Sequence, residues 1–287
     1  MSGVSADQVA VIIPAYNEAA GIGPVLDRLA ALDLPLEIIV VDDGSVDGTA
    51  EAAKRERVRL VCHRRNRGYG AALKSGIKAS SRPWVLFLDA DGTYPVEAIP
   101  AFLQAGAAAP MTVGWRSQAA AVVPILRMTA KRLLTRYAEY LVDEEIPDLN
   151  SGMRLVQREL VLRILRLLPN GFSFTSTLTL AALRDGEQIA YLEIPYARRM
   201  GKSKIRPVRD TFNFIVLITR SGALFNPLRV FLPVSGALFV VAALVLAHDV
   251  FILRNVTDSS TLFFLTSLQT AMLGILADVI AARGGQG

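Results

Sequence analysis

The 287-residue sequence contains a single cysteine, Cys62, and only two tryptophans. One thiol excludes an intramolecular disulfide and a metal site built from several cysteines, and it fits a reducing, cytoplasmic setting. The first residues lack a basic stretch followed by an apolar one, so no cleaved signal peptide is expected. The sequence also lacks nucleic-acid-binding motifs and basic stripes interleaved with aromatics, so nucleic acid is not an expected partner.

Two common phosphate-binding loops are missing as well. The chain has no G-x-x-x-x-G-K-[ST] stretch and no G-x-G-x-x-G directly after a strand-like run. These absences exclude the loops of nucleoside-triphosphate hydrolases and dinucleotide enzymes. The chain does have 52% hydrophobic residues, a mean hydropathy of +0.38 and a net charge of +5. This balance suits a membrane protein whose basic residues meet phosphate groups or an anionic membrane surface.

Short apolar runs alternate with helical segments in the N-terminal part of the chain. Strands are predicted at residues 9–14, 36–41, 59–62, 85–88, 111–114 and 189–195. Helices are predicted up to residue 32 with Asn17 as N-cap, over 48–57 with Asp47 as N-cap, and over 71–79 and 96–105. Alternation of this kind predicts an α/β fold with a mostly parallel sheet and helices on both faces.

Carboxylates follow several of these predicted strands, namely Glu18, Asp42, Asp43, Asp89 and Asp91. Each one alone is more often a helix cap or a turn residue. The carboxyl ends of parallel strands share one edge of a sheet, where ligands of such folds bind. Like charges gathered there repel one another unless a cation or a set of donors neutralises them. The pattern therefore favours a metal-assisted nucleotide site.

Four motifs identify a family to which this chain is similar. The stretches VIIPAYNEA, VVDDGSVDGT, RGYGAALKSGI and FLDADG, in this order and spacing, resemble the family-2 inverting glycosyltransferases of the GT-A fold. The resemblance implies a Rossmann-like GT-A domain that binds a nucleotide sugar. The implied nucleotide-sugar residues are Pro14, Ala15, Tyr16, Glu18, Asp43, Asp89, Ala90 and Asp91. Within this set, Asp89 and Asp91 form the D-x-D pair that would hold Mg²⁺ or Mn²⁺ against the diphosphate.

Two later motifs resemble the polyprenyl-phosphate group of that family, which includes the dolichyl-phosphate mannose synthases. They are Asp148–Arg154 (DLNSGMR) and the basic segment 198–204 (RRMGKSK). The resemblance implies acceptor-phosphate contacts by Arg116, Arg127, Lys131, Arg198, Ser203 and Lys204, and catalytic roles for Asp91, Arg127 and Asp148. Guanidinium groups suit the task because they grip phosphate oxygens in pairs and stay charged. Asp148 is interpreted as an orienting group rather than a base.

The sequence departs from the group at two positions. Thr93 stands where some members carry a glutamine used at the metal, and Lys131 stands where some carry serine. A basic helical face at residues 124–142, which carries Arg127 and Lys131, also has a plainer interpretation as a solvated surface. The departures at positions 93 and 131 leave the identity of the sugar and the geometry of the metal site open.

The C-terminal third contains long uncharged runs. Residues 230–247 and 261–277 approach the ~20 residues that span a bilayer, and a basic amphipathic segment precedes them. We predict a catalytic domain at 1–205, an interface helix at 206–227 and a transmembrane hairpin at 228–287, with spans near 228–248 and 260–282. Arg220, Arg229 and Arg283 mark one end of the hairpin, so the positive-inside tendency places the catalytic domain in the cytoplasm, at the inner membrane. A homo-oligomer is compatible with this architecture.

These features predict an enzyme that moves a hexosyl group from GDP-mannose or UDP-glucose to dolichyl or undecaprenyl phosphate. One alternative is a processive polysaccharide synthase, but the Q-x-x-R-W signature of that class is missing, since Trp84 and Trp115 do not fit it. The other is a non-catalytic membrane subunit that only binds the nucleotide sugar. Such a subunit would be expected to have lost the D-x-D pair or the basic acceptor residues, and both are present.

Overall fold

In the computed structural model of the chain, the strands form a seven-stranded mixed sheet in the order β3-β2-β1-β4-β6-β5-β7. The structure describes residues 3–116, 135–195, 216, 219–220, 222–223 and 226–284. The strands are β1 (Val9–Ala15), β2 (Glu37–Asp42), β3 (Val58–Cys62), β4 (Trp84–Phe87), β5 (Met111–Trp115), β6 (Arg154–Gln157) and β7 (Ile189–Glu193). All neighbouring pairs are parallel except those of β6, which runs antiparallel to β4 and β5. The predicted mostly parallel sheet is confirmed.

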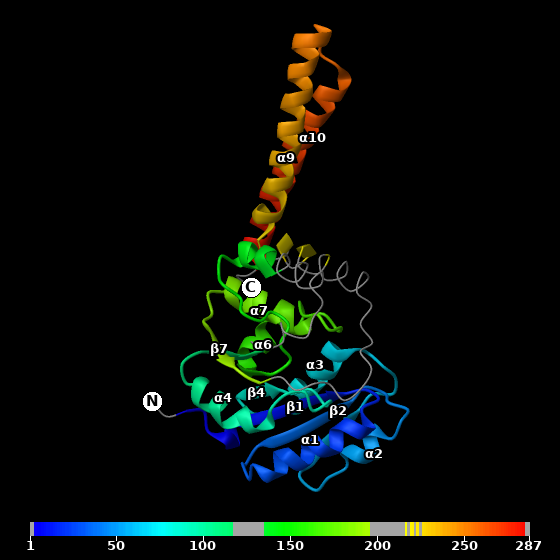
Figure 1. Cartoon of the computed structure of the whole chain (residues 1–287), viewed down its shortest axis with the longest axis vertical. Coiled ribbons are helices and arrows are strands. Elements are labelled where there is room, and N and C mark those ends of the chain that lie inside the picture. Colours follow the sequence, from blue (N-terminus) through cyan, green and yellow to red (C-terminus); the bar gives the residue numbers. More distant parts are fainter. Residues whose placement is uncertain are drawn as a thin grey trace. The chain divides into compact units, whose positions relative to one another are not determined.

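Helices cover both faces of this sheet. The helices of the sheet domain are α1 (Ala19–Ala31), α2 (Thr49–Ala53), α3 (Tyr69–Ala79), α4 (Ile99–Ala105), α6 (Arg158–Ile164) and α7 (Phe174–Arg184), with short 3-10 turns at Ala6–Gln8 and Val96–Ala98. Figure 1 shows α1 and α2 on one face of β1 and β2, and α3 on the other. Helix α3 approaches β1 so closely that a Cβ on Gly76 would lie 2.4 Å from Ile12.

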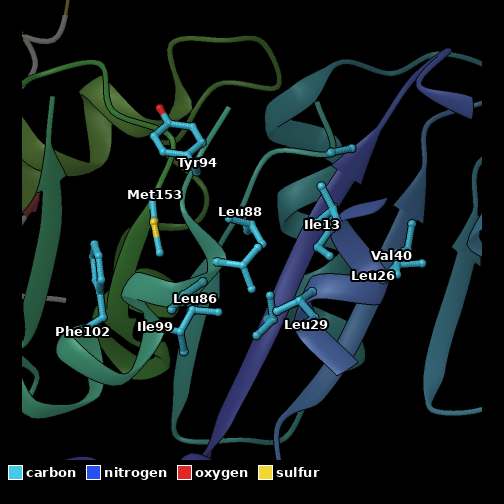
Figure 2. Packing of buried hydrophobic residues seen from close by; sticks show 14 of the residues in the cluster. Ile13, Leu26, Leu29, Val40, Leu86, Leu88, Tyr94, Ile99, Phe102 and Met153 are labelled. Atoms are coloured by element: carbon cyan, nitrogen blue, oxygen red, sulfur yellow. The ribbon is translucent and has the colours of Figure 1, made fainter. Parts of the chain in front are cut away.

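The main core lies between β1, β4 and the helices α1 and α4 (Figure 2). Ile13 and Leu86 from the strands pack with Leu29 of α1 and with Ile99 and Phe102 of α4, and all five side chains are buried. Each such side chain contributes about 1.5–3 kcal/mol when it is fully removed from water. This packing fixes the strand ends at which the predicted site residues stand.

The predicted N-caps of α1 and α2, Asn17 and Asp47, are each wrong by one residue, since Glu18 and Gly48 hold these positions. Asn17 adopts a left-handed backbone (φ 54°), and Glu18 takes the N-cap position of α1. The side chain of Asp47 accepts hydrogen bonds from Thr49 N (3.1 Å) and from Ala19 N (3.2 Å), so it serves the first turns of both helices. Helix α2 also ends at Ala53, earlier than predicted, because the following residues are polar and offer no apolar side chain to bury.

Strand β6 and helices α6 and α7 were not assigned from the sequence. The strand is only four residues long and begins inside the DLNSGMR motif. Its insertion between β4 and β5 places residues 148–153 beside the end of β4. A long-range pairing of this kind has no local signal.

Residues 226–284 form a helical hairpin. Helix α9 (Pro227–His248) continues through a π-helical turn (Asp249–Leu253), and α10 (Asp258–Gly284) returns. Two stretches, Pro227–Leu253 and Asp258–Ala281, are long and apolar enough to cross a membrane, and few of their side chains are buried within the protein. The predicted spans at 228–248 and 260–282 overlap these stretches, and their crossing of a membrane stays a prediction.

A short helical segment at residues 135–142 belongs to the same compact unit as the hairpin. Asn226 Nδ2 donates to Leu141 O (3.2 Å), and Arg229 pairs with Asp143 (3.0 Å) while lying over the Tyr140 ring. Most residues of the predicted interface helix at 206–227, and most of those of the basic helix at 124–142, lie outside the described residues.

Candidate active site

The parallel strands β1, β2 and β4 end at one edge of the sheet. The register pairs Ala15 with Asp42, and Ile12 with Phe87, so the segments that follow these strands emerge together. The predicted nucleotide-sugar residues stand on these segments. They comprise Pro14 and Ala15 at the end of β1, Tyr16 and Glu18 after it, Asp43 after β2, and Asp89, Ala90 and Asp91 after β4. Tyr16 is 39% exposed.

The segments after β1 and β2 are joined by hydrogen bonds. Asn17 N donates to Ser45 Oγ (2.9 Å), and Val46 N donates to Asn17 Oδ1 (3.0 Å). Glu18 N donates to Thr49 Oγ1 (2.9 Å). The side chain of Asn17, which was predicted to cap a helix, therefore ties one loop of the site to the next.

The Asp43 carboxylate is buried and held by three donors. It accepts from Arg67 N (2.9 Å) and Gly68 N (2.7 Å), and it contacts His63 Nδ1 at 2.6 Å. The other ring nitrogen of His63 lies 2.8 Å from Ser75 Oγ. His63 was not predicted as a site residue from the sequence. Its place directly after β3, at the same edge of the sheet, was the available signal.

Asp91, the second carboxylate of the D-x-D pair, is oriented by Thr93. The backbone N and the Oγ1 of Thr93 donate to Asp91 Oδ1 at 3.1 and 2.7 Å. Thr93 is 1% exposed, and its hydroxyl is thereby fixed. The residue noted as a departure from the family pattern thus positions one of the two predicted metal ligands.

Asp89, the first carboxylate of the pair, accepts a hydrogen bond from the Tyr69 hydroxyl at 3.0 Å. Burial, together with the negative charge of Asp89, raises the pKa of Tyr69 well above its usual value, so this hydroxyl stays protonated. On the other side, a Cβ on Gly152 would lie 2.8 Å from Asp89 Oδ2. Tyr94 Oη accepts from Gly152 N (2.6 Å), and burial followed by the charge of Asp89 raises the pKa of Tyr94.

The donor set fits a divalent cation that is shared with a substrate. Asp89 and Asp91 supply hard oxygen ligands, which Mg²⁺ and Mn²⁺ prefer. In the described part of the chain, no group of three or more His, Cys, Asp or Glu side chains could hold a metal ion. An ion held by this pair would take further ligands from water and from substrate phosphates, as Mg²⁺ commonly does.

Arg116 and Asp148 form a bidentate ion pair. Arg116 Nε lies 2.7 Å from Asp148 Oδ2, and Arg116 Nη2 lies 2.9 Å from Asp148 Oδ1. The side chains are 14% and 2% exposed. The sequence placed both residues at the acceptor side without predicting this contact, which joins the end of β5 to the DLNSGMR motif.

Arg154, the last residue of that motif, is fully buried. Its guanidinium donates to Leu149 O (2.8 Å), Ser151 O (2.8 Å) and Thr175 O (2.9 Å), and it also bonds the Thr179 hydroxyl. Burial lowers the pKa of Arg154 to about 10, which still leaves it charged near neutral pH. Arg154 therefore shapes the loop that carries Asp148 by binding its carbonyl groups.

The other predicted acceptor residues are Arg127, Lys131, Arg198, Ser203 and Lys204. All five lie outside the described residues. Their contacts with the acceptor remain predictions from the sequence.

Comparison with known proteins gives two family matches. Residues 10–165 match the model described as Glycosyl transferase family 2, and residues 226–282 match the GtrB C-terminal hairpin. A dolichyl-phosphate hexose transferase of Haloferax volcanii is 34% identical over 206 residues, covering 70% of this chain and 88% of the relative. A polyprenol monophosphomannose synthase of Mycolicibacterium smegmatis is 29% identical over 211 residues, covering 68% of this chain and 80% of the relative.

Solved structures share the fold. Glucosyl-3-phosphoglycerate synthase of Mycobacterium tuberculosis, solved with Mn²⁺, UDP and glucosyl-3-phosphoglycerate, superposes with a TM-score of 0.59 at 24% identity. The match covers 74% of this chain and 79% of that one. This likeness supports the GT-A type of sheet domain.

Proposed function

Because the chain belongs to glycosyl transferase family 2, we propose that it transfers a hexosyl group from a nucleotide sugar, GDP-mannose or UDP-glucose, to a polyprenyl phosphate at the cytoplasmic face of the membrane. The proposal rests on one observation. The chain has both a family 2 domain, with carboxylates gathered at one edge of its sheet, and an apolar helical hairpin. The names of the Haloferax and Mycolicibacterium relatives support a polyprenyl-phosphate acceptor.

On the donor side, Asp89 and Asp91 would hold Mg²⁺ or Mn²⁺ beside the diphosphate. When bound, such an ion neutralises the charge that develops on the leaving nucleoside diphosphate. The Mn²⁺ and UDP in the mycobacterial synthase support this assignment. Thr93 keeps Asp91 oriented, and the buried Asp43 fixes the turn beside the nucleotide.

On the acceptor side, the residues that would bind the lipid phosphate are Arg116, Arg127, Lys131, Arg198, Ser203 and Lys204. A phosphate is already largely ionised near neutral pH, so a strong general base is not required. The protein's main task is then to align two anions that repel each other. The Asp148–Arg116 pair orients this side of the site. Attack on an α-linked donor would give a β-linked product.

The test uses the purified full chain in detergent with Mn²⁺ or Mg²⁺. Radiolabelled GDP-mannose, UDP-glucose and a UDP-N-acetylhexosamine are each offered with undecaprenyl or dolichyl phosphate. We expect label to enter the lipid phase with one donor. Asp91→Asn should abolish the transfer, and Asp27→Asn, an exposed carboxylate on α1, should leave it unchanged.

Two other outcomes would change the assignment. A donor that binds without any lipid labelling would reject the acceptor and favour a nucleotide-sugar-binding subunit. Growth of a polymer from the donor alone would favour a processive synthase.

A further inference from the structure

One short turn contacts carboxylates on two different strand ends. At the start of α3, Arg67 N and Gly68 N donate to Asp43 at 2.9 and 2.7 Å. The hydroxyl of the next residue, Tyr69, donates a hydrogen bond to Asp89 Oδ1 at 3.0 Å. Because the donors are consecutive in the chain, this turn sets the orientation of Asp43 and of Asp89 together.

The turn is itself fixed by the loop that precedes α7. Gly68 has a φ of +102°, and a Cβ there would lie 2.5 Å from Asn170 O. A Cβ on Gly70 would lie 2.3 Å from Pro169 O, and Ala71 N donates to Asn170 O at 3.0 Å. Only glycine permits this backbone contact at both positions. The segment that carries Tyr69 is therefore held rigidly against a distant part of the chain.

The Tyr69 ring is held in addition by stacking. It lies against Phe172 with ring centroids 5.6 Å apart and an interplanar angle of 21°. Phe172 is 86% exposed, so hydrophobic burial does not explain its position. Stacked aromatic rings of this kind contribute about 0.5–1.5 kcal/mol beyond area burial. The contact restricts the ring that delivers the hydroxyl to Asp89.

We propose that Tyr69 is a positioning residue for the divalent ion. Its hydroxyl holds Asp89 Oδ1 while Gly152 confines Oδ2, so the carboxylate is ordered before the ion arrives. An ordered ligand lowers the entropic cost of binding, which is the usual benefit of preorganisation. This inference rests on the proposed function, since it concerns the metal at the same D-x-D pair. It adds a residue outside that pair to the metal site.

The test is a Mn²⁺ titration of the full chain in detergent, followed by the electron paramagnetic resonance signal of free Mn²⁺. Parallel series contain UDP or GDP. Tyr69→Phe removes only the hydroxyl and keeps the stacked ring. A hydrogen bond to a charged group is worth enough to raise the apparent Kd for Mn²⁺ about tenfold or more. Phe172→Ala keeps the hydroxyl and should raise the Kd by a smaller factor.

A matched control is Tyr140→Phe, the same chemical change at an exposed tyrosine whose ring, not its hydroxyl, faces Arg229. Its Mn²⁺ affinity should equal that of the wild type. Binding of nucleotide without metal should be unchanged in Tyr69→Phe. A purely structural role would weaken this binding as well.

The outcomes separate this inference from the proposed function. Mn²⁺ binding by Tyr69→Phe that equals or exceeds wild-type binding overturns the positioning role and leaves the transferase proposal intact. Equal Mn²⁺ binding by wild type and Asp91→Asn, with both nucleotides, rejects the metal site altogether. If Tyr69→Phe unfolds, Gly152→Ala tests the same carboxylate from its other oxygen, and unchanged binding there also overturns the inference.

Discussion

In the described part of the chain, Arg116 and Asp148 form a largely buried ion pair on the proposed acceptor side of the site. Both side chains are largely withdrawn from water, and the two hydrogen bonds have the geometry of a bidentate guanidinium–carboxylate pair. Removing one partner leaves the other charge partly buried without its counterion. Such a loss is far more costly than breaking an ion pair on the surface.

Asp148→Asn should therefore lower both stability and transfer. Loss of a charged hydrogen bond predicts a decrease of about 2 kcal/mol in the free energy of unfolding. Urea denaturation of the purified protein measures this change, and the lipid-labelling assay measures transfer. Asp27→Asn is the control. Full stability in Asp148→Asn would show that the pair contributes little to the fold.

We expect the Asp47 carboxyl group to make a pH-dependent contribution to folding stability at the junction of α1 and α2. Burial alone would raise its pKa, but hydrogen bonds from Thr49 and Ala19 outweigh this effect and hold the pKa below its ordinary value of 3.8. A carboxyl group with a lower pKa in the folded state stabilises the fold above the unfolded pKa. That stabilisation is lost as the pH falls through the folded pKa.

Asp47→Asn should cost about 1 kcal/mol or less at pH 7, as the loss of a helix cap does. The difference in the free energy of unfolding between variant and wild type should shrink below pH 4, because the wild-type carboxyl group then becomes protonated. Denaturant unfolding at pH 7, 4 and 3 measures this. An equal difference at all three values would contradict the assignment.

At the scale of elements, helices α9 and α10 are joined by a reciprocal pair of hydrogen bonds. Ser235 Oγ donates to Ser267 O (2.9 Å), and Ser267 Oγ donates to Ser235 O (3.1 Å). Both side chains are buried between the helices. Polar contacts between apolar helices fix their register where lipid offers no alternative partner.

Ser235→Ala should weaken the hairpin by about 0.6–1.7 kcal/mol, the range measured for hydrogen bonds between membrane helices. Unfolding in mixed micelles with increasing SDS would report the change. The control is Thr266→Ala, since the hydroxyl of this half-buried threonine donates to Leu262 O within its own helix. Equal effects of the two substitutions would show that the contact between the helices adds nothing.

At the scale of the whole molecule, two spans predict that the catalytic domain and the C-terminus lie on one side of the membrane and the loop at 254–257 on the other. The only cysteine, Cys62, is exposed on the sheet domain and can report this topology. Partial burial nevertheless raises the pKa of this thiol, so labelling is best performed at mildly alkaline pH.

A membrane-impermeant maleimide should label Cys62 in inverted inner-membrane vesicles and not in right-side-out vesicles. A Cys62→Ser variant with Asn255→Cys in the loop should show the opposite pattern. Labelling of Cys62 only in right-side-out vesicles would reverse the proposed orientation.

The sequence by itself determined the features that depend on neighbouring residues. Apolar runs of strand length, the carboxylates after them and the uncharged runs near the C-terminus placed β1, β2, β4 and the hairpin within a few residues. These signals are local, because consecutive residues specify a strand end or a membrane span. The D-x-D pair was found in the same way, from its position after a buried strand.

Only the tertiary structure decided which side chains meet. His63 reaches Asp43, Tyr69 reaches Asp89, and Arg116 reaches Asp148, across 20, 20 and 32 positions of the chain. Strand β6 enters the sheet between β4 and β5, against the order of the sequence. Such contacts depend on strand order, register and the close approach permitted by glycines, and none of these is encoded in a short window. The sequence therefore identified the charged edge, and the packing of distant segments determined how its carboxylates are held.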